Sequence, residues 1–340
     1  MATTKIQASP QTAKRSFSAG SVISAIGRWI VRNRIYLIAF AIPAVLTYLA
    51  YALFGLYPFG EESVLCLDLN GQYVYYFEAL RDAFWGDGSI FYNWSRNLSG
   101  EFMGIIGYYL ASPFTLIVML LPEKFMLSSL LIMQLCKLGA AGATFNYFLQ
   151  KRRGVQPYPS LLFSTMYAMM AYGVIQLIDP MWLDGLVFLP LIMLGIEYLV
   201  DDGRRLNFII PLALMCVANF YIGYMICFFV ILYFLFYLCF GSDKKRKGYD
   251  YFTAFVRIAY SSVIALACAA FMLLPVYNAL KLGKFEFTDP DYSFRFQSFP
   301  LSKKLLENAQ DSPLLVFLCD LLDMFPQLLP AQYNSVNVQG

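Results

Sequence analysis

Long apolar runs separated by short polar segments extend over most of the chain. A helix needs about 20 apolar residues to cross the hydrocarbon core of a bilayer, and most of these runs are about that long. The runs therefore predict an all-α integral membrane protein with seven transmembrane helices. The predicted spans are residues 35–57, 126–150, 158–178, 186–201, 207–222, 223–240 and 252–275.

Basic residues predict the orientation of these spans, because Lys and Arg concentrate on the cytoplasmic side of a membrane. Residues 1–34 carry Lys and Arg but no acidic residue, and we expect them to be a basic cytoplasmic tail. Residues 207–240 form one apolar run between two basic loops, so this run must turn back on the outer side, near Gly223. The seven-span module then covers residues 35–279, and residues 280–340 are expected to be extracytoplasmic.

Residues 58–125 form a long outer loop after the first span. The loop is polar and acidic at first, and residues 70–85 have the pattern of an amphipathic helix. A later apolar stretch, residues 104–122, is short and interrupted by Ser112-Pro113. If this stretch crossed the membrane, the basic triplet after residue 150 would lie outside, against the usual bias. We therefore expect a re-entrant or interfacial segment here in addition to the seven spans.

The chain contains no histidine, which narrows the chemistry that it can perform. Histidine-based triads and histidine metal sites are excluded, so a general base has to be a carboxylate, a lysine, a tyrosine or a cysteine. The net charge of +3 gives no strong attraction to nucleic acid. The candidate residues are therefore the acidic side chains of the outer loops and a lysine within a predicted span.

The acidic side chains Asp68, Asp179 and Asp184 lie in the predicted outer loops. Asp68 precedes the helix predicted over residues 70–85, where it would either accept a proton from a hydroxyl group or cap the helix. Asp179 and Asp184 flank Trp182. They would either be solvated acids beside an interfacial tryptophan, or face Asp68 across a cavity and position an acceptor or a cation.

Lys137 lies near the middle of the span predicted over residues 126–150. A charged residue at that depth usually faces a cavity or a partner. The ammonium group would bind a lipid phosphate or pair with an acidic residue of another span. Asn219 and Tyr221 lie near the predicted outer turn, where a hydrogen bond between helices and a contact with substrate explain them equally well.

Four segments carry a resemblance to a known family. They are Asp68-Leu-Asn-Gly-Gln-Tyr73, Tyr108-Tyr-Leu-Ala-Ser-Pro-Phe114, Met181 to Glu197, and Asn219-Phe-Tyr-Ile-Gly-Tyr-Met225. In this order they resemble the bacterial YfhO membrane proteins over about residues 35–280. That family is similar to the GT-C glycosyltransferases, which share a seven-span module and a long first outer loop with an essential carboxylate.

The resemblance implies transfer of a sugar from a polyprenyl-phosphate carrier to a cell-surface polymer such as teichoic acid, on the outer face of the bacterial cell membrane. Asp68 would be the catalytic carboxylate, and Lys137 would hold the donor phosphate. Asp179 and Asp184 would position the acceptor or a divalent metal; no other cofactor is expected. A partner synthase would make the lipid-linked donor. The remaining pocket residues would be Gln72, Trp182, Asn219 and Tyr221.

The chain differs from the family in length, because family members continue for hundreds of residues with more spans and an outer domain. We therefore expect a fragment or a shortened relative. Two further functions stay open from the residues alone. The chain could be a transporter or lipid flippase, with Lys137 and the acidic residues along a pathway. It could also be a non-catalytic partner that supports another membrane enzyme.

Overall fold

The computed structural model describes residues 19–94, 100–242 and 248–281, with side chains from Ser24 onward. The chain divides into two units, residues 1–279 and 280–340. The predicted extracytoplasmic segment 280–340 therefore lies outside the described residues except for Leu280 and Lys281. The longest helices of the first unit are α1 (Ala19–Leu53), α5 (Met126–Arg152), α8 (Leu183–Asp202), α10 (Phe220–Phe236) and α11 (Gly248–Leu280).

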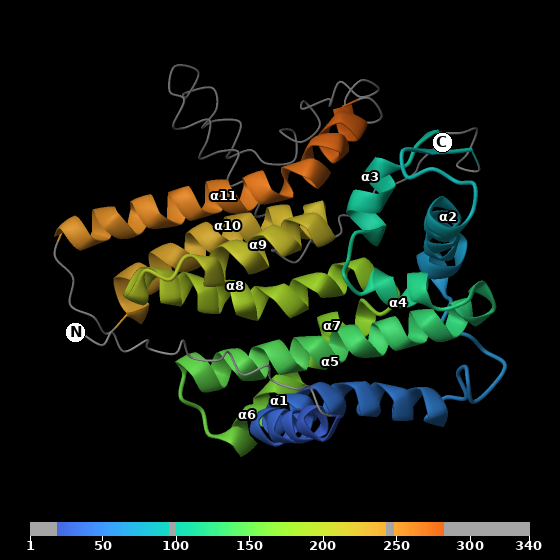
Figure 1. Cartoon of the computed structure of the whole chain (residues 1–340), viewed down its shortest axis with the longest axis horizontal. Helices are drawn as coiled ribbons and strands as arrows, with labels where there is room; N and C mark the ends of the chain where they lie inside the picture. The colour runs from blue at the N-terminus through green and yellow to red at the C-terminus, as the bar shows by residue number, and fades with distance from the viewer. Residues whose placement is uncertain (1–18, 95–99, 243–247, 282–340) are drawn as a thin grey trace, which may run out of the picture. The chain divides into compact units, whose positions relative to one another are not determined.

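Helices α5, α8, α10 and α11 lie side by side in one bundle, whereas α1 runs along α5 in one part only and its N-terminal part bends away (Figure 1). Helix α5 is central, because it packs against α1, α8 and the shorter α6 (Pro157–Ala168). Helix α8 in turn packs against α10 and against α9 (Leu206–Ala218). Five segments within the described residues are long and apolar enough to cross a membrane, namely Ser24–Leu53, Glu123–Arg152, Pro180–Asp202, Phe220–Gly241 and Gly248–Leu280.

Two of the predicted spans differ from the structure. The span predicted over residues 158–178 is interrupted, because α6 ends at Ala168 and Met170 has an extended backbone before the short α7 (Ala171–Ile175). The span predicted over residues 207–222 is the 13-residue helix α9, which ends where Asn219 becomes extended. A helix of that length measures about 20 Å, short of a bilayer core of about 30 Å.

The first helix also begins earlier than predicted. The apolar run predicts a span from Ile35, whereas α1 already begins at Ala19 and contains Pro43 in its interior. Part of the predicted basic tail is therefore helical. Residues 19–34 include Arg28, Arg32 and Arg34, and arginine is a good helix former, so the helix continues N-terminally beyond the long apolar run.

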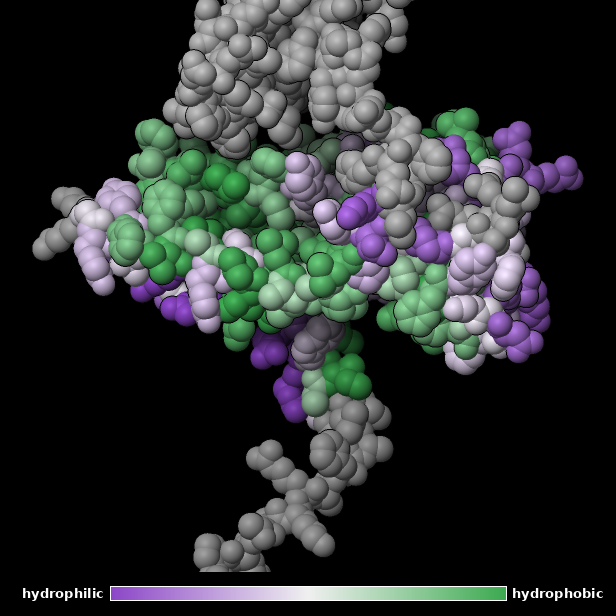
Figure 2. All heavy atoms as spheres, turned by 90° about the horizontal axis from the view of Figure 1, so that it is seen from above, coloured by the Kyte–Doolittle hydropathy of each residue, from purple (hydrophilic) through white to green (hydrophobic). Residues whose placement is uncertain are grey.

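Large apolar side chains remain exposed on the outward faces of α10 and α11. Leu232 and Val263, for example, are 63% and 64% exposed. Figure 2 shows apolar residues over this face and hydrophilic residues gathered toward the end that carries the segment between α1 and α5. An exposed apolar surface of this extent is unfavourable in water and is expected of helices that contact lipid.

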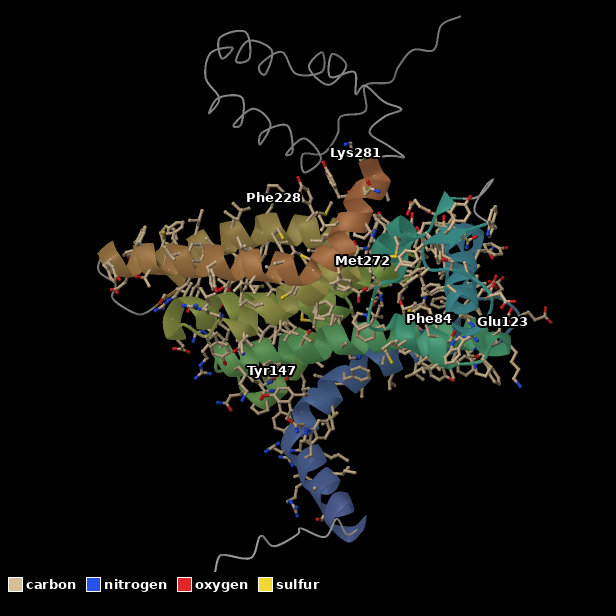
Figure 3. The ribbon with its side chains drawn as sticks, turned by 45° about the horizontal axis from the view of Figure 1, so that its top comes forward. Phe84, Glu123, Tyr147, Phe228, Met272 and Lys281 are labelled. Atoms are coloured by element: carbon tan, nitrogen blue, oxygen red, sulfur yellow. The ribbon has the colours of Figure 1, made fainter. Side chains whose placement is uncertain are left out.

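The segment between α1 and α5 covers one end of the bundle. The helix predicted over residues 70–85 is confirmed as a π-helical turn, η1 (Leu69–Tyr73), which continues into α2 (Val74–Trp85). Figure 3 shows Phe84 of α2 and Glu123 at this end, away from Tyr147 of α5. The elements that follow α2 are β1 (Tyr92–Asn93), β2 (Gly100–Glu101), α3 (Met103–Ile105), η2 (Ile106–Leu110), α4 (Thr115–Leu120) and η3 (Glu123–Phe125).

The stretch predicted to be re-entrant or interfacial is helical but broken. Helix α3 and the π-helical turn η2 are separated from α4 by the residues around Ser112 and Pro113. Ile105, Leu110 and Val118 are buried, so the segment packs against the bundle. Backbone that does not span the membrane needs such a protein lining. The depth of the segment in a membrane stays a prediction.

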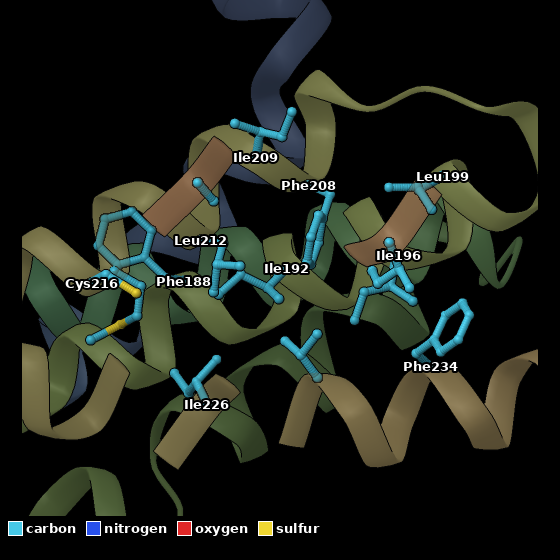
Figure 4. Close-up of a cluster of buried hydrophobic side chains, with 14 of the residues drawn as sticks. Phe188, Ile192, Ile196, Leu199, Phe208, Ile209, Leu212, Cys216, Ile226 and Phe234 are labelled. Carbon is cyan, nitrogen blue, oxygen red and sulfur yellow. The ribbon is translucent and has the colours of Figure 1, made fainter. Parts of the chain in front are cut away.

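The largest group of buried apolar side chains joins α8, α9, α10 and α11 (Figure 4). The cluster contains Phe188, Ile192 and Ile196 of α8, Leu212 of α9 and Phe234 of α10. The contact between α8 and α9 is especially close at Gly195. A Cβ atom there would lie 2.4 Å from the Asn207 carbonyl oxygen. Small residues permit such close approach of helices.

Glycine residues also permit the close contact between α1 and α5. A Cβ atom on Gly139 would lie 2.7 Å from the Phe40 carbonyl oxygen, and one on Gly142 would lie 2.5 Å from the Ala39 carbonyl oxygen. Because the obstructing atoms are backbone, a side chain at either position would push the two helices apart. The contacts between α8 and α9 and between α1 and α5 therefore depend on glycine.

Candidate functional site

Asp68 follows a residue with an unusual backbone conformation. Leu67 has a φ of 48°, in the left-handed region that residues with side chains rarely adopt. Asp68 stands at the N-terminus of η1, yet its side chain makes no capping hydrogen bond. Its carboxylate is exposed. The structure therefore does not support helix capping as the reason for this residue, and strained positions of this kind cluster at functional sites.

The hydroxyl group of Tyr73 lies between two of the predicted site residues. It donates a hydrogen bond to Asp179 Oδ1 at 2.8 Å and lies 3.4 Å from Asp68 Oδ2. Burial raises the pKa of Tyr73, and so do the hydrogen bond to Asp179 and the charges of both carboxylates. The phenol therefore keeps its proton in the physiological range. Tyr73 brings together two carboxylates that are more than 100 residues apart in the sequence.

Aromatic rings surround this arrangement. The ring of Tyr109 lies 5.1 Å from those of Tyr73 and Tyr76 and 4.5 Å from that of Tyr108. Tyr108 in turn contacts Tyr221 at 5.8 Å. Two π-helical turns, η1 and η2, carry Tyr73, Tyr108 and Tyr109. Such turns change the direction of side chains and often occur at functional sites.

Four predicted pocket residues lie at this end of the bundle with different partners. Gln72 is exposed. Trp182 is half-buried in the 3-10 turn η4 (Pro180–Trp182). Asn219 is fully buried; it caps α10 by accepting a hydrogen bond from the Ile222 amide, and it donates to the Tyr108 carbonyl at 2.8 Å. These bonds explain Asn219 as a residue that links η2 to the start of α10. The side chain of Tyr221 is 39% exposed.

Lys137 and Asp184 form a buried ion pair. Lys137 Nζ lies 2.7 Å from Asp184 Oδ2, and the two side chains are 1% and 0% exposed. Lys137 also donates to the Pro180 carbonyl at 2.8 Å, and Ser112 donates to the second oxygen of Asp184 at 2.8 Å. Of the two alternatives for Lys137, the structure contains the ion pair. Binding of a donor phosphate by Lys137 or of an acceptor by Asp184 stays a prediction and would require this pair to open.

A neighbouring residue of α5 strengthens the same connection. Gln134 is buried and donates to the Leu177 carbonyl at 2.6 Å. Gln134 and Lys137 together attach α5 to the loop that carries Asp179 and Trp182. Gln134 was not predicted as a site residue, although it lies three positions before Lys137 on the same helix, which places both side chains on one face.

A second polar network joins α5, α8 and α10 at the opposite end of the bundle. Arg152 binds Glu197 at 2.8 Å and also contacts Asp201, and Arg153 binds Glu197 at 2.5 Å. Tyr233 donates to Glu197 and Tyr237, in the π-helical turn η5 (Tyr237–Gly241), donates to Asp201. In the sequence these arginines indicate only the orientation of the chain. The acidic partners lie on a different helix, so local sequence does not reveal them.

The two networks show how the chain runs between the ends of the bundle. Arg153 at the end of α5 lies in one network, and Asp179 lies at the opposite end. The chain from residue 153 to residue 179, with α6 and α7, therefore passes from one end to the other. The same holds for α9, which connects Asp201 with Asn219. Neither segment is long enough to count as a complete span, so the two additional spans stay a prediction.

Metal binding was predicted only as an alternative role for Asp179 and Asp184. Among the residues that the structure describes, no three histidine, cysteine, aspartate or glutamate side chains form a group that could hold a metal ion. Both carboxylate oxygens of Asp184 already have partners. The residues present therefore do not fit a metal site at these two positions.

The fold is that of a multi-span α-helical membrane protein with polar and aromatic residues gathered at one end of the bundle. Its sequence matches the family described as bacterial membrane protein YfhO over residues 39–308. Because this match covers most of the chain, the protein belongs to the YfhO family. The resemblance of the four segments is thereby confirmed.

A curated relative is similar to part of the chain. The uncharacterized protein YfhO of Bacillus subtilis (strain 168) is 27% identical over 168 residues, which cover 44% of this chain and 19% of that protein. The chain thus matches about a fifth of the length of this relative. No solved structure matches the chain.

Proposed function

We propose that this chain is the part of a membrane glycosyltransferase that activates the acceptor. The enzyme would move a sugar from a polyprenyl-phosphate carrier to a surface polymer such as teichoic acid. The observation that carries the proposal is the exposed Asp68 carboxylate, which follows a strained residue and lies beside Tyr73 and Asp179. An exposed carboxylate can reach a hydroxyl group of a polymer that arrives from the aqueous side.

The proposal includes an orientation. The end of the bundle with Asp68 faces the outside of the bacterial cell membrane, and the end with Arg152 and Arg153 faces the cytoplasm, as positive residues favour. The N-terminus is then cytoplasmic, and the chain passes through the bundle seven times, as the sequence predicts. Two of these passages, α6–α7 and α9, would be surrounded by protein and by locally thinned lipid, because short helices need such an environment.

In the proposed reaction, Asp68 acts as general base. The carboxylate accepts the proton of an acceptor hydroxyl group, and the hydroxyl oxygen forms a bond to the anomeric carbon of the sugar. The bond between that carbon and the phosphate oxygen breaks, and polyprenyl phosphate leaves with the electron pair. Removing a positioned general base lowers the rate by about 10² to 10⁴. Attack from the face opposite the phosphate inverts the anomeric configuration.

The other residues have supporting roles in this proposal. Tyr73 holds Asp179 with its hydrogen bond, and Asp179 and the exposed Gln72 position the acceptor. Exposed aromatic rings such as that of Tyr221 stack on a sugar face, since flat apolar rings with a polar edge suit such surfaces. Trp182 would add a second ring. The donor phosphate would approach Lys137 only after Asp184 releases it.

The test compares sugar transfer by membranes that contain the native chain or one of two variants. A radiolabelled polyprenyl-phosphate sugar is the donor, and label in the polymer fraction is measured. Asp68→Asn should abolish transfer and retain donor binding, because the amide keeps the shape but not the basicity. Glu61→Gln is the matched control, since Glu61 is another exposed acid of the same loop.

Three outcomes would contradict the proposal. If Asp68→Asn transfers sugar at the native rate, Asp68 is not the base. If membranes with well-inserted native chain transfer no sugar even when the donor-making synthase is supplied, the chain is not a transferase by itself. If the chain moves labelled lipid across the bilayer without forming a covalent product, it is a transporter.

A further inference from the structure

The first outer loop contains a pocket that is separate from the site around Asp68. It has a volume of about 330 Å³ and lies between α2 and the β1 strand that follows it. Its described lining includes the acidic residues Glu78, Asp82 and Asp87 and the aromatic residues Tyr75, Tyr92 and Trp94. Pockets of about 300 Å³ and above are typical of small-molecule sites.

The pocket and the site around Asp68 lie on opposite faces of the helix formed by η1 and α2. Tyr73 and Phe77 are buried against the bundle, whereas Tyr75, Glu78 and Asp82 recur at the spacing of a single helix face and line the pocket. The pocket therefore opens away from the carboxylates at Tyr73. A ligand in it would not occupy the position proposed for the acceptor.

The carboxylates of the pocket have no cationic partner. Among the described residues, Glu78, Asp82 and Asp87 form no ion pair, and no lysine or arginine lines the pocket. The adjacent Arg81 points elsewhere, because its guanidinium binds the carbonyl oxygens of Val118, Met119 and Leu121. Within the described part of the chain, the pocket therefore combines three carboxylates with no neighbouring cation.

The pKa of Glu78 is affected by the neighbouring carboxylates. Burial raises the pKa of Glu78, and the neighbouring carboxylates of Glu123 and Asp82 raise it further. Like charges in one place destabilise the ionised form of each. A cation bound among these carboxylates would remove that repulsion.

The aromatic wall determines which kind of cation fits. Tyr92 and Trp94 contact each other edge to face with ring centroids 4.9 Å apart, and Trp94 is 81% exposed. Exposed aromatic faces beside carboxylates attract organic ammonium groups through cation–π interactions. A bare metal ion fits less well, because no three acidic side chains in the described part of the chain converge as metal ligands.

We propose that this pocket binds an organic ammonium ion, with the ammonium group among Glu78, Asp82 and Asp87 and its alkyl part against Trp94 and Tyr92. The ion is either a free small amine or an amine carried by a surface polymer. Phosphate-rich segments are repelled by the three carboxylates. The proposal is independent of sugar transfer, because none of its residues contributes to the Asp68 site.

Calorimetric titration of the purified chain with choline tests the proposal. The neutral isostere 3,3-dimethyl-1-butanol is the control ligand, because it has the same shape without the charge. Choline should bind at least about tenfold more tightly than the alcohol. Asp82→Asn and Trp94→Leu should each weaken choline binding by about threefold or more. Glu61→Gln and Asp68→Asn should leave it unchanged, since both residues lie outside the pocket.

A second titration distinguishes the two sources of the amine. Glucosamine oligomers carry an ammonium group on each sugar, whereas their N-acetylated counterparts carry a neutral acetamide at the same position. Binding of the charged oligomers with higher affinity than choline assigns the pocket to an amine-bearing polymer, and the reverse order assigns it to a small amine. Equal binding of choline and the alcohol, preferential binding of the neutral oligomers, or equal losses in Asp82→Asn and Glu61→Gln would each overturn the proposal. Melting curves of every variant establish that it is folded.

Discussion

Replacing Asp184 by asparagine should strongly destabilise the bundle, because it removes the charge that balances Lys137. The ammonium group of Lys137 is 1% exposed and has two acceptors, Asp184 Oδ2 at 2.7 Å and the Pro180 carbonyl at 2.8 Å. The substitution preserves the shape of residue 184 and its contact with Ser112. What it changes is the charge, so Lys137 is left as an uncompensated buried cation.

The size of the effect follows from this geometry. Breaking a buried ion pair by removing one partner costs about 3–5 kcal/mol, because the remaining charge stays in a medium of low dielectric constant. We expect this cost for Asp184→Asn and for Lys137→Met. The double variant contains neither charge, so its loss of stability should be smaller than the sum of the two single losses by at least about 2 kcal/mol.

Reversible unfolding of the purified chain in mixed detergent micelles provides the measurement. The free energy of unfolding is determined for the native chain, the two single variants and the double variant, and the coupling energy is the deviation from additivity. Glu61→Gln is the control for loss of an exposed carboxylate and should change the free energy little.

Additive losses in this cycle would refute the reasoning. They would mean that Lys137 does not depend on Asp184 and that its ammonium group is available to another anion. The donor phosphate of the proposed transferase would then be a natural partner. A large coupling energy shows instead that Lys137 is a structural residue, which holds the loop containing Trp182.

Two further predictions concern glycine packing and pH. Gly195→Ala should lower the melting temperature in detergent, because the new Cβ atom would lie 2.4 Å from the carbonyl oxygen of Asn207, at a cost of about 1–3 kcal/mol. Gly27→Ala is the control, because a Cβ atom there would have no atom within 4 Å. Equal melting temperatures of the two variants would contradict the packing argument. For Glu78 the folded pKa is raised above the ordinary value of 4.5, so folding is favoured as the pH falls from above the folded pKa toward 4.5. Glu78→Gln should therefore stabilise the chain at pH 7 in amine-free buffer and lose this advantage near pH 4.5, and an advantage independent of pH would show that charge is not its origin.

Local sequence predicts the helices well where apolar runs are long. The spans over residues 126–150 and 252–275 appear as α5 and α11, because length and composition suffice for such segments. It predicts less well where a backbone break depends on packing. Met170 interrupts a run that looks continuous. The turn expected near Gly223 lies instead at the extended Asn219, and Gly223 is inside α10.

Some residues of the candidate site can be predicted from the sequence and others cannot. The sequence selects Asp68, Asp179 and Lys137, because acidic residues in a loop and a charge within a span are conspicuous. It does not select Tyr73, which joins Asp68 to Asp179, because tyrosine is common in this chain and its role depends on contacts across more than 100 residues. Pairing of Lys137 with Asp184 rather than with another acid likewise depends on how α5 and α8 pack.

The network of Arg152, Arg153 and Glu197 has a consequence for biosynthesis. When the ribosome has made Arg153, it still has to add 44 residues before Glu197 exists. During that interval both guanidinium groups are uncompensated, which is when a nascent membrane segment responds to positive charge. Only after α8 has been inserted beside α5 do the acidic side chains neutralise them. The same arginines can therefore direct insertion as free charges and later hold two neighbouring helices together as ion-pair partners.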